Sequence, residues 1–205
     1  WLLSLSQFCT NVGWLFLVTW LPRFLDEEYQ VPLEERGKMV TIALAVGWLG
    51  TLSGGKVTDW LMRRISLRWS RVLPIALSRF TAMAAYLVCL LEISPWTSVI
   101  MFSIVAFSTD FGSPAMWAFN QDIAGKHVGS VLGWGNMWGN LGAAVAPSLM
   151  IAVITVNTAS GEEHHWNMAF VTCAIAFFIA GVASLFVDSS RKLVVDDEDG
   201  MLETA

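Results

Sequence analysis

Amide side chains recur at helical spacing inside two stretches of otherwise apolar sequence. Gln7, Asn11 and Trp14 follow an i, i+4, i+7 pattern, which places them on one face of a helix. Asn136 and Asn140 lie one helical turn apart in the other stretch. Amides both donate and accept hydrogen bonds, so either face could line the path of a polar solute or join neighbouring helices. For the first face both roles remain open.

The second stretch divides its polar and its small residues between two faces of one helix. Gly135 and Gly139 are one turn apart, and Gly142 and Ala146 continue the same face. Small residues in this arrangement let two helix backbones approach closely. The two asparagines lie roughly 100° around the helix from this seam. We therefore expect the glycine face to pack on a neighbouring helix while Asn136 and Asn140 border a solute cavity.

An acidic residue, Asp110, occurs near the middle of a third apolar stretch and is followed by Gly112, Ser113 and Pro114. A carboxylate inside a membrane is costly unless it is paired or hydrated, which makes Asp110 a functional candidate. Pro114 removes the helix hydrogen bond to the Asp110 carbonyl, so we expect a broken or kinked helix beside water. Asp110 could serve in coupling, or it could be a structural residue that holds the kink.

The elements that carry these residues are predicted to be membrane-spanning helices. Of the 205 residues, 55% are hydrophobic and only 14% are charged, and the mean hydropathy is +0.58. A spanning helix needs about 20 mostly apolar residues, and continuous runs without alternation favour helices over a barrel. Six segments qualify: 1–25, 39–57, 72–91, 96–119, 128–155 and 168–187. We therefore predict an all-α, six-helix transmembrane bundle over 1–187, followed by an acidic, disordered cytoplasmic tail over 188–205.

Charges in the connections between these segments alternate in sign and set the orientation. Basic residues gather between the second and third segments, after the fourth, and at the start of the tail: Lys56, Arg63, Arg64, Arg68, Arg71, Lys126, Arg191 and Lys192. Acidic residues gather in the other connections: Asp26, Glu27, Glu28, Glu34, Glu35, Glu92, Glu162 and Glu163. We expect a multi-pass protein of the cell membrane with both ends of this segment in the cytoplasm. Arg79 is interpreted as reaching back to the cytoplasmic interface, in preference to a role in a cavity.

Other classes of function find little support in the sequence. No basic run is interleaved with aromatic residues, so nucleic acid is not an expected partner. Cys9, Cys89 and Cys173 lie in apolar runs without metal-ligand spacing, which predicts buried, free thiols and no metal or cofactor. No nucleophile–base pair is recognisable, so an enzyme is not expected, and a channel would need a filter or ring of charge.

A ten-residue stretch after the second apolar segment resembles the major facilitator signature Gly-x-x-x-Asp-Arg-x-Gly-Arg-Arg. Gly55, Asp59, Arg63 and Arg64 match in register, whereas Trp60 and Met62 replace the usual Arg and Gly. The resemblance implies that these four residues form a cytoplasmic latch that holds one state of a rocking cycle. The alternative is a plain basic cytoplasmic loop.

Two longer stretches resemble the anion:cation symporter branch of the same superfamily. The first comprises Phe8, Cys9, Asn11, Gly13, Trp14, Trp20, Leu21, Pro22, Phe24 and Leu25. The second comprises Asp110, Pro114, Trp117, Asp122, Gly129, Ser130, Gly133, Asn136, Gly139, Asn140, Gly142 and Pro147.

The resemblance implies the second half of a twelve-helix carrier that moves a small organic anion, often a sugar acid, with protons or sodium. The implied partners are the solute, a coupling cation, membrane lipid and an N-terminal six-helix half. The implied substrate contacts are Asn136 and Asn140, then Asn11, with Gln7 and Trp14 on the same face. A carrier of another small solute is the main alternative.

Overall fold

The computed structural model describes residues 1–91, 93–158 and 161–190, and six long helices make up most of this part of the chain. The helices are α1 Leu2–Glu27, α2 Leu33–Met62, α3 Leu67–Val88, α4 Pro95–Ala124, α5 Val128–Ile154 and α6 Trp166–Leu185. A short 3₁₀ turn, η1 Gly125–His127, joins α4 to α5, so that these form one apolar helical stretch from Pro95 to Ile154. With that stretch counted as one, five helical stretches of the described residues are long and apolar enough to cross a membrane. The predicted helical membrane bundle is confirmed.

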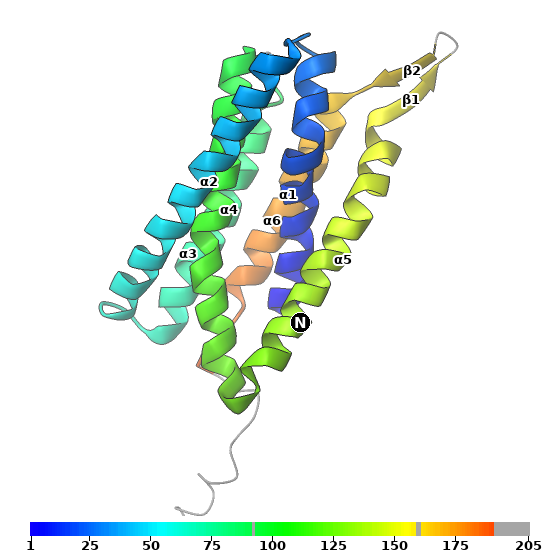
Figure 1. The fold of residues 1–205 in the computed structure, drawn as a ribbon. Coiled ribbons are helices and arrows are strands. Elements are labelled where there is room, and N and C mark those ends of the chain that lie inside the picture. The colour runs from blue at the N-terminus through cyan, green and yellow to red at the C-terminus, as the bar shows by residue number, and fades with distance from the viewer. Residues whose placement is uncertain (92, 159–160, 191–205) are drawn as a thin grey trace, which may run out of the picture.

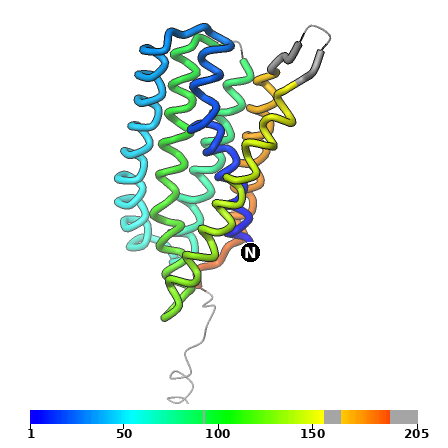
Figure 2. The backbone as a smooth tube through the Cα atoms, turned by 45° about the vertical axis from the view of Figure 1, so that its right-hand side comes forward, coloured from blue at the N-terminus to red at the C-terminus, as the bar shows by residue number. Residues whose placement is uncertain are grey.

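The six helices form two groups that are joined at the back of the bundle (Figures 1 and 2). In one group α2 and α3 both pack extensively on α4, and in the other α1 packs on α5 and α6. The main contact between the groups is that of α3 with α6, whereas α4 touches α1 and α5 only sparsely. This weak boundary between α4 and the α1–α5 pair is where a cavity can open.

The charge segregation predicted from the sequence is present in the bundle. The N-terminus, the α2–α3 connection and the α4–α5 turn lie at one end (Figure 1). The α2–α3 connection and the α4–α5 turn carry basic residues, while the α1–α2 connection at the other end carries acidic ones. At that acidic end the cations are ion-paired, with Arg36 Nη2 2.9 Å from Asp26 Oδ1 and Lys38 Nζ 2.6 Å from Glu34 Oε1.

Two glycine seams hold the helices within each group together. On α5 the buried residues include Gly135, Gly139 and Gly142, which face α1, so the predicted seam is confirmed. A Cβ atom at Gly142 would collide with the Phe8 carbonyl of α1. The second seam, on α2, consists of Gly47, Gly50 and Gly54 against α4. The sequence analysis missed this second seam.

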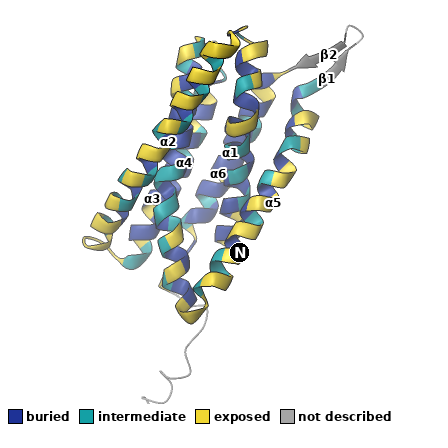
Figure 3. Cartoon of the chain, viewed as in Figure 1, coloured by how far each residue is buried: buried dark blue, intermediate teal, exposed yellow. Residues whose placement is uncertain are grey.

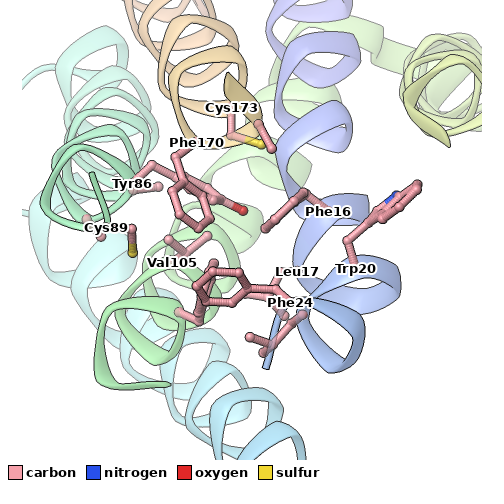
Figure 4. Close-up of a cluster of buried hydrophobic side chains, with 14 of the residues drawn as sticks. Phe16, Leu17, Trp20, Phe24, Tyr86, Cys89, Val105, Phe170 and Cys173 are labelled. Carbon is pink, nitrogen blue, oxygen red and sulfur yellow. The ribbon is translucent and has the colours of Figure 1, made fainter. Parts of the chain in front are cut away.

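An aromatic core fills the half of the bundle nearer the acidic end (Figure 4). Phe16 contacts Tyr86 and Phe102 at centroid distances of 6.1 Å, and Phe170 at 5.7 Å. The Tyr86 hydroxyl donates a 2.7 Å hydrogen bond to the Gly13 carbonyl, which satisfies a polar group that would otherwise be costly to bury. All three cysteines are buried and free, as predicted, and Cys89 and Cys173 lie beside this cluster.

Helices α2 and α5 carry much of the exposed surface, whereas α1, α3 and α6 are more deeply buried (Figure 3). Large apolar side chains dominate these exposed faces. On α2 they include Trp48, Leu49 and Leu52, and on α5 they include Leu141, Val145 and Ile151. Such faces suit contact with lipid or with another helical half.

The structure corrects several details of the sequence analysis. Helix α2 extends beyond the apolar segment 39–57 at both ends, so Gly55 and Asp59 lie in its last turns and not in a loop. Helix α4 is continuous through Pro114, so it is not broken there. The connection before α6 contains an unpredicted antiparallel hairpin, β1 Thr155–Thr158 with β2 Gly161–His164. Most of the predicted tail, 191–205, lies outside the described residues.

Candidate functional site

A cavity of about 220 Å³ lies at the boundary between the two helix groups. Its walls come from α1, α3, α4 and α5. The lining residues are Gln7, Thr10, Asn11, Trp14, Arg79, Thr109, Asp110, Ser113, Met116, Gly135, Asn136, Gly139 and Asn140. The structure therefore brings together all five predicted substrate-contact residues and Asp110, which the sequence places more than 100 residues apart at the extremes. Their roles in binding stay predictions.

The polar face of α1 is held in place by hydrogen bonds within the cavity wall. The Gln7 Nε2 amide donates to Met116 Sδ at 2.9 Å, and Asn11 Nδ2 donates to the Gln7 backbone carbonyl at 2.9 Å. The Gln7 Oε1 atom is buried and has no hydrogen-bond partner among the described residues. An acceptor of this kind is unfavourable unless something in the cavity donates to it.

The glycine seam of α5 makes room for these amides. A Cβ atom at Gly135 would lie 2.7 Å from Gln7 Oε1, and one at Gly139 would lie 3.0 Å from Asn11 Nδ2. The absence of side chains at the two glycines thus lets the α1 amides sit between the helices. On the adjacent face of α5, Asn136 and Asn140 are exposed and border the same cavity. One helix therefore supplies both close packing and polar lining, as the sequence predicted.

The carboxylate of Asp110 lies where α2, α4 and the cavity meet. A Cβ atom at Gly47 of α2 would lie 2.6 Å from Asp110 Oδ2, so the α2 seam also makes room for a polar side chain. One turn along α4, the Ser113 hydroxyl donates to the Thr109 carbonyl at 3.2 Å. Pro114 does not line the cavity, and its expected role in bending stays a prediction.

Arg79 also lines this cavity, and its interpretation as a residue that reaches the cytoplasmic interface is wrong. The side chain is only 2% exposed, and it approaches α4 through a long 3.5 Å contact from Nη1 to the Thr109 carbonyl. Helix α3 begins at Leu67, five residues before the predicted segment. The side chain instead lines the same cavity as Asp110 and the α1 amides. No sequence signal distinguished the two roles, because they depend on how α3 packs against α4.

The four residues of the expected cytoplasmic latch lie at the end of α2. Asp59 is exposed, and no ion pair joins it to Arg63 within the described part of the chain. The Arg64 guanidinium stacks over the Trp60 ring at 5.9 Å, and Gly55 has open space around it. Their role as a latch stays a prediction.

The sequence analysis missed a buried ion pair at the same end of the bundle. Arg71 Nε of α3 lies 2.7 Å from Asp122 Oδ2 of α4, and the two side chains are only 5% and 19% exposed. Arg71 Nη2 also contacts Met62 Sδ at 3.4 Å, which links this pair to the end of α2. The partners are 51 residues apart in sequence, so only the packing of α3 on α4 reveals them.

Comparison with known proteins agrees with this architecture. The structure is similar to a crystal structure of a peptide transporter in complex with sulfate, with a TM-score of 0.71 at 13% identity. The match covers 99% of this chain and 42% of that one, and at this identity it concerns the fold alone.

Sequence relatives include two proteins of Escherichia coli (strain K12) named as probable galactarate/D-glucarate transporters. The chain is 28% identical to GudP over 192 residues and 29% identical to GarP over 189 residues. These matches cover 93% and 91% of this chain but only 41% and 40% of the relatives. The chain thus spans less than half the length of the curated relatives that it matches.

The model of the Major Facilitator Superfamily matches residues 1–147, which is well over half of the chain and includes the first four helices and most of α5. This match agrees with the multiple membrane-length helices and with the transporter fold. The chain is a multi-pass membrane protein that belongs to the Major Facilitator Superfamily.

Proposed function

We propose that this chain forms the second six-helix half of a carrier that moves a small sugar acid across the cell membrane by alternating access. The observation that carries the proposal is the polar cavity between α1, α3, α4 and α5, in which amides, a carboxylate and a guanidinium converge. The relatives named as galactarate/D-glucarate and L-galactonate transporters favour a sugar acid as the solute.

The lining of the cavity suits the chemistry of such a solute. Sugar acids carry several hydroxyl groups, each of which both donates and accepts hydrogen bonds, as the Asn136 and Asn140 amides do. Trp14 supplies an apolar surface against which the C–H groups of the carbon chain can pack. Asp110 is the residue of this half that we propose for coupling to a proton or sodium gradient.

Alternating access requires a partner for the exposed polar face. We propose that an N-terminal six-helix half covers Asn136 and Asn140 and supplies the remaining solute contacts, with the site near mid-membrane. Both ends of this segment face the cytoplasm in this arrangement, as the basic connections favour. The residues Gly55, Asp59, Arg63 and Arg64 then lie at the cytoplasmic face, where they can latch one half against the other.

Uptake of radiolabelled D-glucarate by the full-length protein in proteoliposomes tests the proposal. We expect an inward proton or sodium gradient to stimulate uptake, and Asn140→Ala to raise the KM roughly 2–12-fold through the loss of one hydrogen bond. The matched control is Leu141→Ala, because Leu141 is the next residue of α5, is exposed, and does not line the cavity.

Each outcome of the uptake experiment has a distinct meaning. An unchanged KM in the Asn140 variant would remove this residue from the site and leave the carrier class standing. Absence of D-glucarate uptake by folded wild-type protein, under either gradient, would refute the sugar acid as the solute. Transport of a different solute in that case would retain the carrier and change its substrate.

A further inference from the structure

The buried guanidinium of Arg79 has fewer hydrogen-bond acceptors around it than it has N–H donors. A guanidinium carries five N–H donors. Nε has no hydrogen-bond partner among the described residues, and Nη1 has only the Thr109 carbonyl at 3.5 Å. Such a contact is beyond the usual length of a protein hydrogen bond. A side chain 98% buried in this condition is costly unless a further acceptor completes its surroundings.

Asp110 does not complete those surroundings. Both residues line the cavity, but no ion pair within 4.0 Å joins them in the described residues. The other buried arginine of α3 provides the comparison. Arg71 makes contacts of 2.7 and 3.4 Å with the two carboxylate oxygens of Asp122. In this pair both carboxylate oxygens accept hydrogen bonds from the guanidinium. Arg79 and Asp110 make no such contact in the described part of the chain, although both line the same cavity.

Two other unpartnered polar atoms belong to the same cavity wall. Gln7 Oε1 and Thr109 Oγ1 are both buried without hydrogen-bond partners in the described part of the chain. The first can only accept a hydrogen bond, and the second can donate or accept one. A cation, an amide acceptor and a hydroxyl together complement a carboxylate that has a hydroxyl group on the neighbouring carbon. This is the terminal group of a sugar acid.

We propose that Arg79 binds a carboxylate of the transported solute. The proposal rests on the proposed function and adds the residue that recognises the anionic end of the solute. Guanidinium groups suit this task because they present two parallel N–H donors to a carboxylate. The carboxylate oxygens of the solute then accept the hydrogen bonds for which the Arg79 N–H groups have no partner in the described part of the protein.

The competing explanation is that Arg79 only neutralises Asp110 and has no contact with solute. Thermal stabilisation of the purified full-length protein by D-glucarate distinguishes the two explanations. D-glucitol, which has the same carbon skeleton without carboxylates, is the control ligand. The variants are Arg79→Gln, Asp110→Asn and the double variant. Arg79→Gln alone leaves the Asp110 carboxylate without a nearby cation, whereas the double variant removes both charges. Lys38→Gln removes an equal charge at an exposed position outside the cavity and is the matched control.

We expect D-glucarate, and not D-glucitol, to stabilise the wild type, Asp110→Asn and Lys38→Gln. The double variant is expected to fold but to bind D-glucarate roughly 10–150-fold more weakly, because a hydrogen-bonded charge is lost. Wild-type affinity in the double variant would overturn the proposal and leave the proposed function intact. Equal stabilisation of the wild type by D-glucitol would overturn it without any variant.

A folded wild type that D-glucarate does not stabilise is a third, distinguishable pattern. This result contradicts the proposal that the solute is a sugar acid, and with it the proposal that Arg79 binds D-glucarate. Stabilisation of that same wild type by succinate, lost in the double variant, would instead retain Arg79 as a carboxylate-binding residue and change only the solute class.

Discussion

Gly54→Ala is expected to destabilise the full-length protein, whereas Gly55→Ala at the next position is expected to leave its stability unchanged or slightly higher. A Cβ atom at Gly54 would collide with the backbone carbonyl of Phe111 on α4, and a backbone cannot move aside as a flexible side chain can. At Gly55 the added methyl group meets open space. We expect a loss of about 1–3 kcal/mol at Gly54, as for other insertions into a well-packed interface.

The apparent melting temperature of the detergent-purified protein, followed by size-exclusion chromatography of heated samples, provides the measurement. The two variants differ by one position in the same helix, so differences in expression or helix propensity act on both. Equal stability of the two variants would contradict close packing of α2 on α4. A Cβ atom at Gly50 would collide with the Phe107 carbonyl. A similar loss of stability in Gly50→Ala would show that the close packing of α2 on α4 continues for one more turn.

The cavity wall could be predicted from the sequence wherever periodicity alone determined it. Gln7, Asn11, Asn136 and Asn140 lie on their helix faces at fixed angles, so their convergence needed only the assumption that the faces pack inward. The α5 seam followed from the same reasoning. The α2 seam has comparable spacing at Gly47, Gly50 and Gly54, so its signal was present in the sequence and was overlooked.

Arg79 and the Arg71–Asp122 pair could not be predicted, for a different physical reason. Whether an arginine side chain extends toward the membrane surface or into the bundle depends on which helices pack around it, and a single sequence does not show this. The Arg79 side chain is enclosed where α3 packs against α4, with Nη1 facing the Thr109 carbonyl. The partner of Arg71 is supplied by another helix, and which helices adjoin is a property of the packed structure.

These two arginines lie on the same helix but differ in their surroundings. Arg71 lies near the start of α3 and has a close carboxylate partner, so its charge is already compensated. Arg79 lies two turns deeper, where its charge faces a cavity that a solute can fill. Removing one partner of a buried ion pair leaves an uncompensated charge, whereas under the proposal above the charge of Arg79 is compensated by the bound anion.

Asp122→Ala is therefore expected to destabilise the full-length protein by about 3–5 kcal/mol, because it leaves Arg71 buried without a counter-charge. The matched control is Glu34→Ala, which breaks the Lys38–Glu34 pair. Those two side chains are 66% and 84% exposed, so the loss should fall within about 1 kcal/mol. The melting temperature again provides the measurement, and equal effects of the two substitutions would contradict the burial of the Arg71–Asp122 pair.

The double variant Arg71→Met with Asp122→Leu separates two ways in which this pair could matter. Because charges are costly to bury, replacement by apolar side chains of similar volume should recover most of the stability that Asp122→Ala loses. If the pair serves only packing, D-glucarate uptake by the stable double variant should equal that of the wild type. A stable double variant with altered uptake would instead show that the ion pair biases the equilibrium between inward-open and outward-open states. In that case the pair, whose Arg71 contacts Met62 at the end of α2, would perform the state-holding role that the resemblance implies for Asp59 and Arg63.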